Sequence, residues 1–448
     1  MSSFATYRGH VRAHLTLGLP LVGSQLAQVA VQTTDTLMVG WYDVRALAAL
    51  VLATSLYLIL MIFFSGFAWA VTPLVAAAAE AGDNQRIRRA TRMGLWLVLA
   101  GGVLCLPIFW FSAPLLRVLG QEADIADMAQ TYLRIAGFGL IPALVVMTLK
   151  GYLSALEHTR VQFWVTVGAA VANAGLNWLL IFGNLGAPEM GIRGAALASL
   201  AVNALSALAL AAYSLRVFPA HRLFQRLWRP DPSAFREVAG MGWQIGLTTV
   251  AEVGLFNFSS IIMGWIGAVA LAAHGIALQV TTVAFMVQLG LSNAATVRAG
   301  RSMGRRDFTA LRDGALSVWG LGFAFALVAV AVFLLFPDAL VGAFVDPDDP
   351  LRPRILVIGG SLLAMAALFQ VADSAQVMGI SILRGMQDTR VPMLMAAFAY
   401  WGVGAPAMWV FGVLLGGGGI GVWVGLVLGL TVSAILLAFR FRRLVSTL

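Results

Sequence analysis

The chain has 448 residues, of which 60 % are apolar and 11 % are charged, and its mean hydropathy is +0.88. Soluble domains carry roughly a quarter of their residues as charges, so this composition excludes a water-soluble protein and indicates a polytopic membrane protein. The formal net charge of +9 needs no nucleic-acid partner, because membrane topology and anionic lipid also select for positive charge. The single cysteine, Cys105, excludes a disulfide framework and a thiolate metal site.

Ten long apolar runs follow one another along the chain, separated by charged segments. They cover approximately residues 13–42, 46–79, 93–116, 128–156, 161–188, 194–215, 238–297, 314–337, 355–383 and 391–439. One crossing of a bilayer takes about 20 helical residues, so the runs 238–297 and 391–439 are each long enough for two. Each contains a glycine break where a turn fits, at residues 264–267 and 416–419. The sequence therefore predicts an all-α protein with twelve transmembrane helices.

Arginines and acidic residues fall in alternate loops. The loops on the side of the N-terminus are rich in arginine, as in residues 86–92, 216–236 and 298–312. The opposite loops carry acidic residues, as in 122–127 and 338–349. Because loops rich in arginine stay in the cytoplasm, we expect both termini to be cytoplasmic, in the inner (plasma) membrane of a bacterium.

The chain repeats itself. The segment LMVGWYDVRALAAL, which starts at Leu37, aligns with IIMGWIGAVALAAH, which starts at Ile261, at an offset of 224 residues. Further along, LSALEHTRV from Leu153 aligns with LRGMQDTRV from Leu383 at an offset of 230. Each half is predicted to hold six helices and to start on the same side, which is typical of transporters built from parallel repeats. We expect a six-helix bundle over 1–215, a cytoplasmic linker over 216–236 and a second six-helix bundle over 237–448.

Three acidic residues lie inside predicted spans, namely Asp35, Glu252 and Asp373. Glu252 is twelve residues from either end of the apolar stretch 240–265, which places it near the middle of the bilayer. An ionisable group at that depth costs several kcal/mol unless it faces a partner or a wet cavity, and it marks an ion or substrate pathway by default. The alternatives are that Asp35 reaches the outer surface or caps a broken helix, and that the other two acids each bond a neighbouring hydroxyl or backbone group.

Polar residues surround Asp35 in the sequence. Gln32 and three threonines flank it, and Asn173 and Asn177 lie four residues apart, on one face of the fifth predicted helix. This pattern is typical of a hydrogen-bonded polar cluster inside a helical bundle.

Aromatic and sulfur-containing side chains near these acids have two interpretations. Either they face a cavity for flat organic cations, through cation–π and dispersion contacts, or they pack against helices and lipid. The candidates for the cavity are Phe256, Phe285, Met286, Phe369 and Met378. His274 has no obvious partner, and we expect a core histidine whose nitrogens are satisfied rather than a proton relay. The tryptophans Trp41, Trp265 and Trp423 are expected to be interfacial anchors.

Several segments together resemble the multidrug and toxic compound extrusion (MATE) transporters, and within them the NorM branch. These segments are LPLVGSQLAQVAVQTTDTLMVGW, EHTRV, VANAGLNW, GIRGAALA, AEVGLFNFSSIIMGW, VADSAQVMGISILRGMQDTRVP and GIGVW, and they extend over nearly the whole chain. The resemblance implies two pseudo-symmetric six-helix bundles. It also implies export of bulky, often cationic organic compounds, with a role in antibiotic resistance, driven by inward flow of Na⁺ or H⁺.

The resemblance also assigns residues. Asp35, Asn173 and Asn177, joined by Ser199 and Gln32, match a cation- or proton-linked site in the N-terminal bundle. Glu252 and Asp373 match a pair of acids that holds a cation in the C-terminal bundle, where Asn257 and Ser259 add neutral oxygens. Phe285 and Phe369 match aromatic positions beside that cation site. An amide at position 177 favours the NorM branch and weakens a two-carboxylate proton site in this bundle.

We therefore predict a secondary antiporter that works by alternating access, with Na⁺ or, almost as readily, H⁺ as the coupling ion and with no cofactor. Its expected partners are drugs, organic cations and membrane lipids, and we expect a monomer. A flippase for lipid-linked precursors is the alternative within the superfamily, although its embedded charges would be basic. The sequence does not exclude an ion channel, which is a further alternative. An enzyme is not expected, because the sequence has no HExxH or GxSxG motif in a suitable span.

Overall fold

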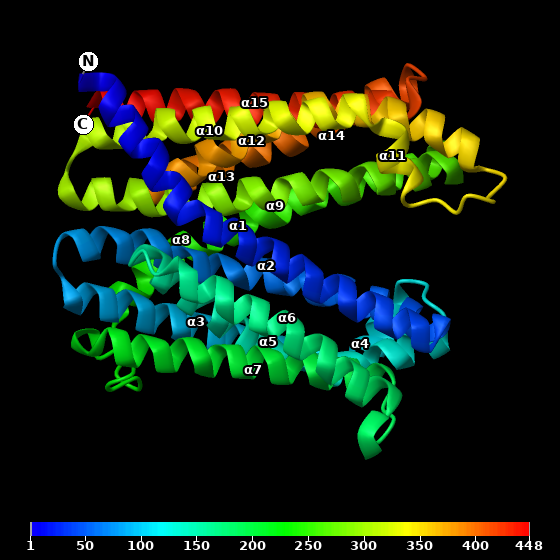
Figure 1. Cartoon of the computed structure of the whole chain (residues 1–448), viewed down its shortest axis with the longest axis horizontal. Helices are drawn as coiled ribbons and strands as arrows, with labels where there is room; N and C mark the ends of the chain where they lie inside the picture. The colour runs from blue at the N-terminus through cyan, green and yellow to red at the C-terminus, as the bar shows by residue number, and fades with distance from the viewer. Residues whose placement is uncertain (1, 448) are drawn as a thin grey trace. The chain divides into compact units, whose positions relative to one another are not determined.

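The structure is a computed structural model that describes residues 2–447, apart from the side chains of residues 2–7 and 44. Every regular element in this range is helical (Figure 1). The N-terminal half consists of α1 (Ser2–Tyr42), α2 (Val44–Glu80), α3 (Asn84–Trp110), α4 (Ser112–Val118), α5 (Ala123–Ala155), α6 (Thr159–Phe182) and α7 (Ile192–Val217), with short 3-10 turns η1 (Asn184–Gly186) and η2 (Pro219–His221). The C-terminal half consists of α8 (Pro232–Ile266), α9 (Ala268–Arg305), α10 (Phe308–Leu335), α11 (Pro337–Gly342), α12 (Arg352–Gly385), α13 (Arg390–Ala397), α14 (Ala405–Trp409) and α15 (Gly418–Thr447), with π-helical segments η3 (Phe398–Gly404) and η4 (Val410–Leu414).

Eleven helices within the described residues are long and apolar enough to cross a membrane. One of them, Arg390–Leu414, is a single span made of α13, η3, α14 and η4. The remaining predicted span, 13–42, lies in α1, which is 41 residues long but carries glutamines, threonines and Asp35 that lower its hydropathy. The prediction of an all-α polytopic membrane protein is confirmed, and the helix count agrees with the predicted twelve once α1 is included.

Glycines end helices at both of the predicted breaks. Gly267 separates α8 from α9 with a φ of 147°. Gly416 and Gly418 precede or begin α15 with φ values of 69° and 54°. Side chains with a Cβ rarely adopt these backbone angles, whereas glycine does so freely. The predicted turns within 264–267 and 416–419 are therefore confirmed, and each long apolar run forms two spans.

The internal repeat is visible in the positions where helices begin. α2 and α9 begin at residues 44 and 268, and α3 and α10 begin at residues 84 and 308, so both pairs differ by 224. Asp83 and Asp307 cap α3 and α10 in the same way, because each carboxylate accepts a hydrogen bond from the backbone N–H three residues on, at 2.8 and 2.9 Å. Further along, Glu157 and Gln387, 230 residues apart, share a φ of 63°. The two halves therefore repeat local structure as well as sequence.

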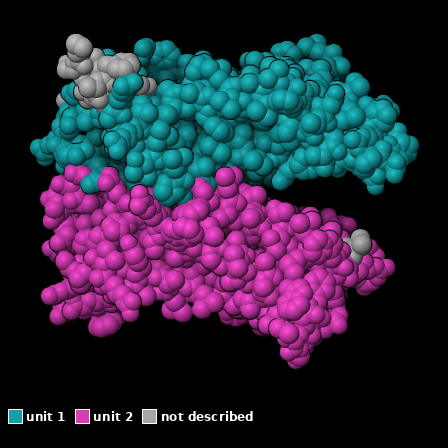
Figure 2. Space-filling view, viewed as in Figure 1, with its two compact units in different colours: residues 1–22, 247–448 teal, residues 23–246 magenta. Residues whose placement is uncertain are grey.

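The chain forms two compact units, coloured separately in Figure 2. Unit 1 combines the start of α1, up to Val22, with the chain from Leu247 onwards, and unit 2 is Gly23–Gly246. The core of unit 1 includes Phe369, Trp423 and Leu426. The core of unit 2 includes Leu74, Leu149 and Tyr152. The predicted bundle limits, 1–215 and 237–448, follow the sequence repeat and stay a prediction.

Close backbone contact joins α2 to the first part of α8 within unit 2. A Cβ placed on Gly66 would lie 2.3 Å from the carbonyl oxygen of Gly242 and 2.4 Å from the backbone nitrogen of Gly246. Helices in a membrane gain packing energy by such close approach of small residues, because lipid supplies no hydrophobic drive between them. No larger residue fits at position 66 without moving one helix.

The connection between α7 and α8 is bound to the start of α3. Arg89 forms an ion pair with Asp231, and Arg86 forms another with Glu237 at 2.7 Å. The indole N–H of Trp96 donates to the carbonyl oxygen of Leu227 at 2.7 Å. The hydrogen bond from Arg89 holds the pKa of the Asp231 carboxyl well below its usual range. Within unit 2, residues 218–231 are therefore held against α3.

Candidate functional site

A polar cluster lies inside unit 2, where α1, α6 and α7 meet. The Nδ2 of Asn177 donates to Oδ1 of Asp35 at 2.5 Å and to Oδ1 of Asn173 at 3.2 Å. The hydroxyl of Ser199 donates to Oδ2 of Asp35 at 3.1 Å. Both asparagines are fully buried. The structure thus brings Asp35 of α1 together with Asn173 and Asn177 of α6 and Ser199 of α7.

One polar atom of this cluster, Oδ1 of Asn177, has no protein partner among the described residues. A carboxylate beside a spare amide oxygen is a plausible set of ligands for a hard cation or a place for a proton. Gln32 is exposed on α1, and its backbone carbonyl accepts from the hydroxyl of Thr36 at 3.0 Å. No hydrogen bond joins the Gln32 side chain to the cluster within the described range.

Two acids of unit 1, Glu252 on α8 and Asp373 on α12, lie at the same depth. The rings of Phe256 and Phe369 are in contact, with their centroids 5.9 Å apart. Phe256 follows Glu252 by four residues, and Phe369 precedes Asp373 by four, which is about one helical turn. Because α8 and α12 are the seventh and tenth spans and run in opposite directions, this contact brings the two acids level. Their charges interact electrostatically.

The carboxylates of this pair are poorly supplied with hydrogen bonds. Asp373 is 1 % exposed, and its Oδ2 has no partner in the described structure. The same holds for Oε1 of Glu252. Buried carboxylate oxygens normally accept hydrogen bonds or bind a cation, since an unpaired buried charge is costly. The pair is therefore a candidate site for a cation or a proton.

Charged and polar residues missed at the sequence level surround the pair. Glu252 interacts electrostatically with Arg384, which lies near the end of α12, and with Tyr400 of η3. The Nε2 of Gln376 donates to the Tyr400 hydroxyl at 2.6 Å. Gln370, one turn from Asp373, is fully buried. For the two glutamines the sequence signal is the same as for the acids, namely a polar side chain in the middle of an apolar run.

Asn257 and Ser259, the predicted neutral ligands, have other hydrogen-bond partners. The Nδ2 of Asn257 donates to the carbonyl oxygen of Val253 on its own helix at 3.1 Å, and the residue is exposed. The hydroxyl of Ser259 donates to the carbonyl oxygen of Phe256 at 2.7 Å. Their role as cation ligands stays a prediction.

His274 of α9 is paired on both ring nitrogens. The indole N–H of Trp423 donates to Nδ1 at 3.1 Å, so Nδ1 carries the lone pair. The neutral ring then bears its proton on Nε2 and donates it to the hydroxyl of Ser259 at 3.1 Å. The expectation of a satisfied core histidine is confirmed. The expectation that Trp423 is an interfacial anchor is wrong, because the side chain is fully buried and its N–H is bonded to His274.

The predicted cavity residues occupy different environments. Phe369 is 4 % exposed and packs edge-on against Phe256 and against Trp423, whose ring centroid is 5.6 Å away. Met378 is fully buried in a separate apolar cluster. Phe285 and Met286 are half-buried on α9. The assignment of all five, including Phe256, to a substrate cavity stays a prediction.

The only lysine in the sequence, Lys150, lies inside unit 2. The Nζ of Lys150, on α5, lies 3.4 Å from the hydroxyl of Ser24, which in turn lies 2.9 Å from the hydroxyl of Thr166. Thr166 donates to the carbonyl oxygen of Gln162 at 2.8 Å, so the hydroxyl of Ser24 donates to Thr166 and accepts from Lys150. No ion pair of Lys150 is present among residues 2–447. This ammonium has a hydroxyl as its polar partner.

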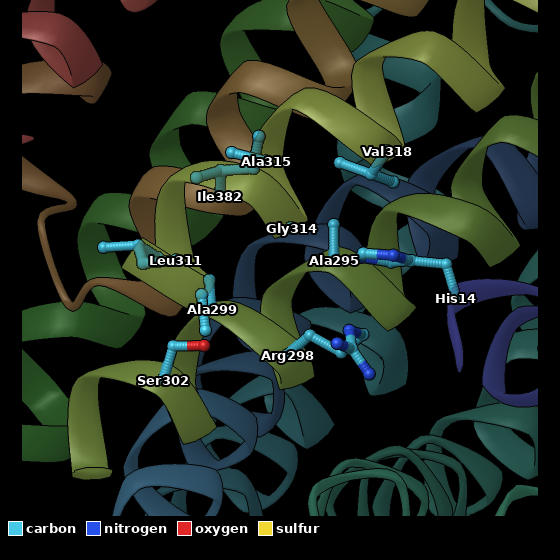
Figure 3. A pocket seen from close by; sticks show the side chains of 11 residues that line it. His14, Ala295, Arg298, Ala299, Ser302, Leu311, Gly314, Ala315, Val318 and Ile382 are labelled. Atoms are coloured by element: carbon cyan, nitrogen blue, oxygen red, sulfur yellow. The ribbon is translucent and has the colours of Figure 1, made fainter. Parts of the chain in front are cut away.

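Unit 1 contains a small pocket, shown in Figure 3. His14 of α1 and Arg298 of α9 line it, together with mostly apolar residues of α9, α10 and α12. The Nη2 of Arg298 donates to Nδ1 of His10 at 2.9 Å. Neither Glu252 nor Asp373 lines this pocket, so it does not correspond to the candidate cation site.

Comparisons with known proteins agree with one another. The MatE family model matches residues 20–179 and 245–410, one segment in each repeat. The "Probable multidrug resistance protein NorM" of Rhizobium meliloti is 46 % identical over 437 residues, which cover 97 % of this chain and 94 % of the relative. A protein of the same description from Agrobacterium fabrum is 42 % identical, and the match covers 99 % of this chain and 96 % of the relative.

Solved structures with the same fold are more distant in sequence. A crystal structure described as "MATE in the bent conformation" matches with a TM-score of 0.88 at 20 % identity, over 100 % of this chain and 98 % of the other. An "outward-facing conformation of a multidrug resistance MATE family transporter of the MOP superfamily" matches with a TM-score of 0.89 at 20 % identity, over 98 % and 96 % of the two chains. At this identity the likeness establishes the fold alone.

Proposed function

Because the chain belongs to the MatE family of transporters, we propose that it exports bulky, often cationic organic compounds in exchange for inward Na⁺ or H⁺. It is a multi-pass membrane protein and not an enzyme, as the sequence predicted. The substrate class is supported by the multidrug resistance that the names of its relatives describe.

The pair formed by Glu252 and Asp373 is the observation that carries the coupling part of the proposal. Two carboxylates at one depth repel each other, and each has an oxygen without a hydrogen-bond donor. A bound Na⁺ relieves this repulsion through direct oxygen ligands, and a proton relieves it by neutralising one of the acids. Occupancy of the site by a cation therefore changes the free energy of the unit that contains it.

Coupling follows if the cation and the drug favour different conformations. A ligand shifts a conformational equilibrium only by its difference in affinity for the two states. In the proposed cycle, cation binding from outside favours release of the drug outside, and cation release to the cytoplasm lets a new drug molecule bind. The cluster around Asp35 is a second site linked to the cation in unit 2, where Asn177 and Ser199 hold the carboxylate in place.

The proposal includes a location and an assembly state. The arginine-rich loops support an orientation with both termini cytoplasmic, and the bacterial relatives support the inner membrane. We propose a monomer among membrane lipids, which is supported by the fact that each candidate site draws its residues from a single chain.

Export by reconstituted protein tests the proposal. Ethidium efflux is measured in proteoliposomes under an imposed Na⁺ gradient, and then under a pH gradient, for the wild type and for Glu252→Gln and Asp373→Asn. Glu122→Gln, which changes an exposed acid before α5, is the matched control. We expect gradient-driven efflux from the wild type and the control, and loss of at least about tenfold in both site variants, which corresponds to about 1.4 kcal/mol of coupling free energy.

Two results contradict the proposal. If correctly folded wild-type protein shows no gradient-driven efflux, the proposal that it is an antiporter is contradicted. Near-normal efflux from both Glu252→Gln and Asp373→Asn removes these acids from the coupling mechanism, although the protein would still be an antiporter.

A further inference from the structure

Gln370 of α12 is a buried amide without hydrogen-bond partners, a condition that it shares with Gln288 of α9. Both residues are 0 % exposed, and neither Nε2 nor Oε1 of either one has a partner among the described residues. Buried polar groups in native proteins are bonded in the great majority of cases, because an unpaired one loses its hydration without compensation. Gln162 of α6 is the usual case. Its Nε2 donates to the carbonyl oxygen of Lys150 and to the hydroxyl of Ser154, both at 2.9 Å.

Gln370 differs from Gln288 in its place on α12, close to one of the two acids. It precedes Asp373 by three residues, and side chains three apart on a helix are neighbours. Gln376 follows Asp373 by three residues, and its Oε1 also has no partner in the described part of the chain, although its Nε2 is bonded to Tyr400. Asp373 therefore lies between two amide oxygens that are free to bind a ligand, at the depth of Glu252.

The chemistry of these oxygens distinguishes between the two coupling ions. Amide and carboxylate oxygens are ligands for hard metal cations. A carboxylate can also carry a proton, and the protonated acid can donate a hydrogen bond to one amide oxygen, which leaves the other amide oxygen without a partner. A metal cation can bind both amide oxygens together with the carboxylates. No cluster of three or more His, Cys, Asp or Glu that could hold a metal ion occurs among the described residues, which argues against a transition metal.

We propose that the side-chain oxygen of Gln370 is a ligand of the Na⁺ ion bound by Glu252 and Asp373. The inference rests on the proposed function and narrows it, because it names Na⁺ as the ion that this site takes. Gln370 contributes a neutral oxygen from the turn before Asp373, and the two acids contribute the charge.

Na⁺ binding by purified protein tests the inference. Na⁺ is titrated calorimetrically against choline in detergent for the wild type, Gln370→Met and Gln370→Glu. The Met side chain has nearly the length of Gln but no oxygen, whereas the Glu side chain keeps an oxygen at the end of the chain. Gln279→Met, which changes an exposed glutamine of α9, is the control. We expect Gln370→Met to weaken Na⁺ binding at least tenfold, and both Gln370→Glu and the control to bind within about threefold of the wild type.

Thermal unfolding separates a ligand from a purely structural residue. In choline buffer, Gln370→Met removes two unpaired buried atoms, so we expect its Tm to equal or exceed that of the wild type. We also expect Na⁺ to raise the Tm of the wild type and the control but not that of Gln370→Met. If Gln370 were only a structural residue, Gln370→Met would have a lower Tm than the wild type in choline, and Na⁺ would raise its Tm as it does that of the wild type.

The outcomes distinguish the inference from the proposed function. An unchanged Na⁺ affinity in Gln370→Met overturns the inference while Na⁺-driven efflux stands. A wild type that binds no Na⁺ and exports drug under a pH gradient also overturns it, and leaves a proton-coupled antiporter. If no gradient drives efflux, the proposed function is wrong. The transport assay alone measures this, independently of the Na⁺-binding experiment.

Discussion

Replacing His274 by phenylalanine tests whether this buried histidine is a structural residue. Phenylalanine has a ring of similar size but neither accepts nor donates hydrogen bonds, so His274→Phe leaves the indole N–H of Trp423 without an acceptor. Trp423 is 0 % exposed, and water cannot replace the lost partner. The cost of leaving one buried donor unpaired is about 1–3 kcal/mol. The bond to Ser259 contributes about 0.5–1.5 kcal/mol more, because that hydroxyl still donates to Phe256.

These terms together predict a destabilisation of about 2–4 kcal/mol. Reversible unfolding in detergent measures it for the wild type, His274→Phe, Trp423→Phe and the double variant. Because the double variant has neither donor nor acceptor, the double-mutant cycle should give a coupling energy of about 0.5–3 kcal/mol. Efflux per folded molecule should stay at the wild-type level.

Two outcomes would refute this reasoning about His274. One is an unfolding free energy of His274→Phe within about 0.5 kcal/mol of the wild type, the usual range for a harmless surface change. The other is loss of efflux driven by a pH gradient at unchanged stability, which would identify His274 as a proton carrier.

Three further predictions concern polar groups of unit 2. Asn177→Leu removes both hydrogen bonds of that amide, so we expect a loss of about 2–4 kcal/mol of stability. The loss caused by Asn177→Leu should be smaller in the background of Asp35→Asn, and a double-mutant cycle of unfolding measurements in detergent will check this. The pKa of Asp231 is lowered by Arg89, so the stabilising contribution of this carboxylate is full above about pH 4 and is lost as the pH falls further. The protection of residues 218–231 against hydrogen exchange, corrected for the intrinsic rate at each pH, should fall at acid pH in the wild type and should already be lower at pH 7 in Asp231→Asn. Lys150→Met keeps the length of the side chain and removes a partly buried charge without an ionic partner among the described residues, so we expect a Tm equal to or above that of the wild type. A fall of several degrees would contradict this.

The membrane architecture was predictable because the bilayer imposes it on local sequence. A span of about 20 apolar residues must form a helix in lipid, since no water is present to pair its backbone. The breaks within 264–267 and 416–419 were predictable for the same local reason, as glycine adopts the positive φ that ends a helix there. The repeat was predictable from an offset of 224, which the starts of α2 and α9 reproduce.

The candidate sites were predictable in part. Asp35, Glu252 and Asp373 were evident because depth in a span follows from counting residues, and a carboxylate at that depth is costly. Asn173 and Asn177 were evident because their spacing of four places them on one helix face. Gln370 was missed because a neutral amide in a span is a weaker signal than a charge, and only its lack of hydrogen-bond partners draws attention to it.

The sequence by itself determined the spans, their order, the orientation expected from arginine, the repeat and the depth of each acid. Only the tertiary structure decided which polar groups are partners. It paired Ser259 with His274, buried Trp423 against that histidine, and left Gln370 beside Asp373 with its amide free. The physical reason is that helical periodicity specifies the depth and the face of a side chain, whereas its partner depends on which other helix packs against that face.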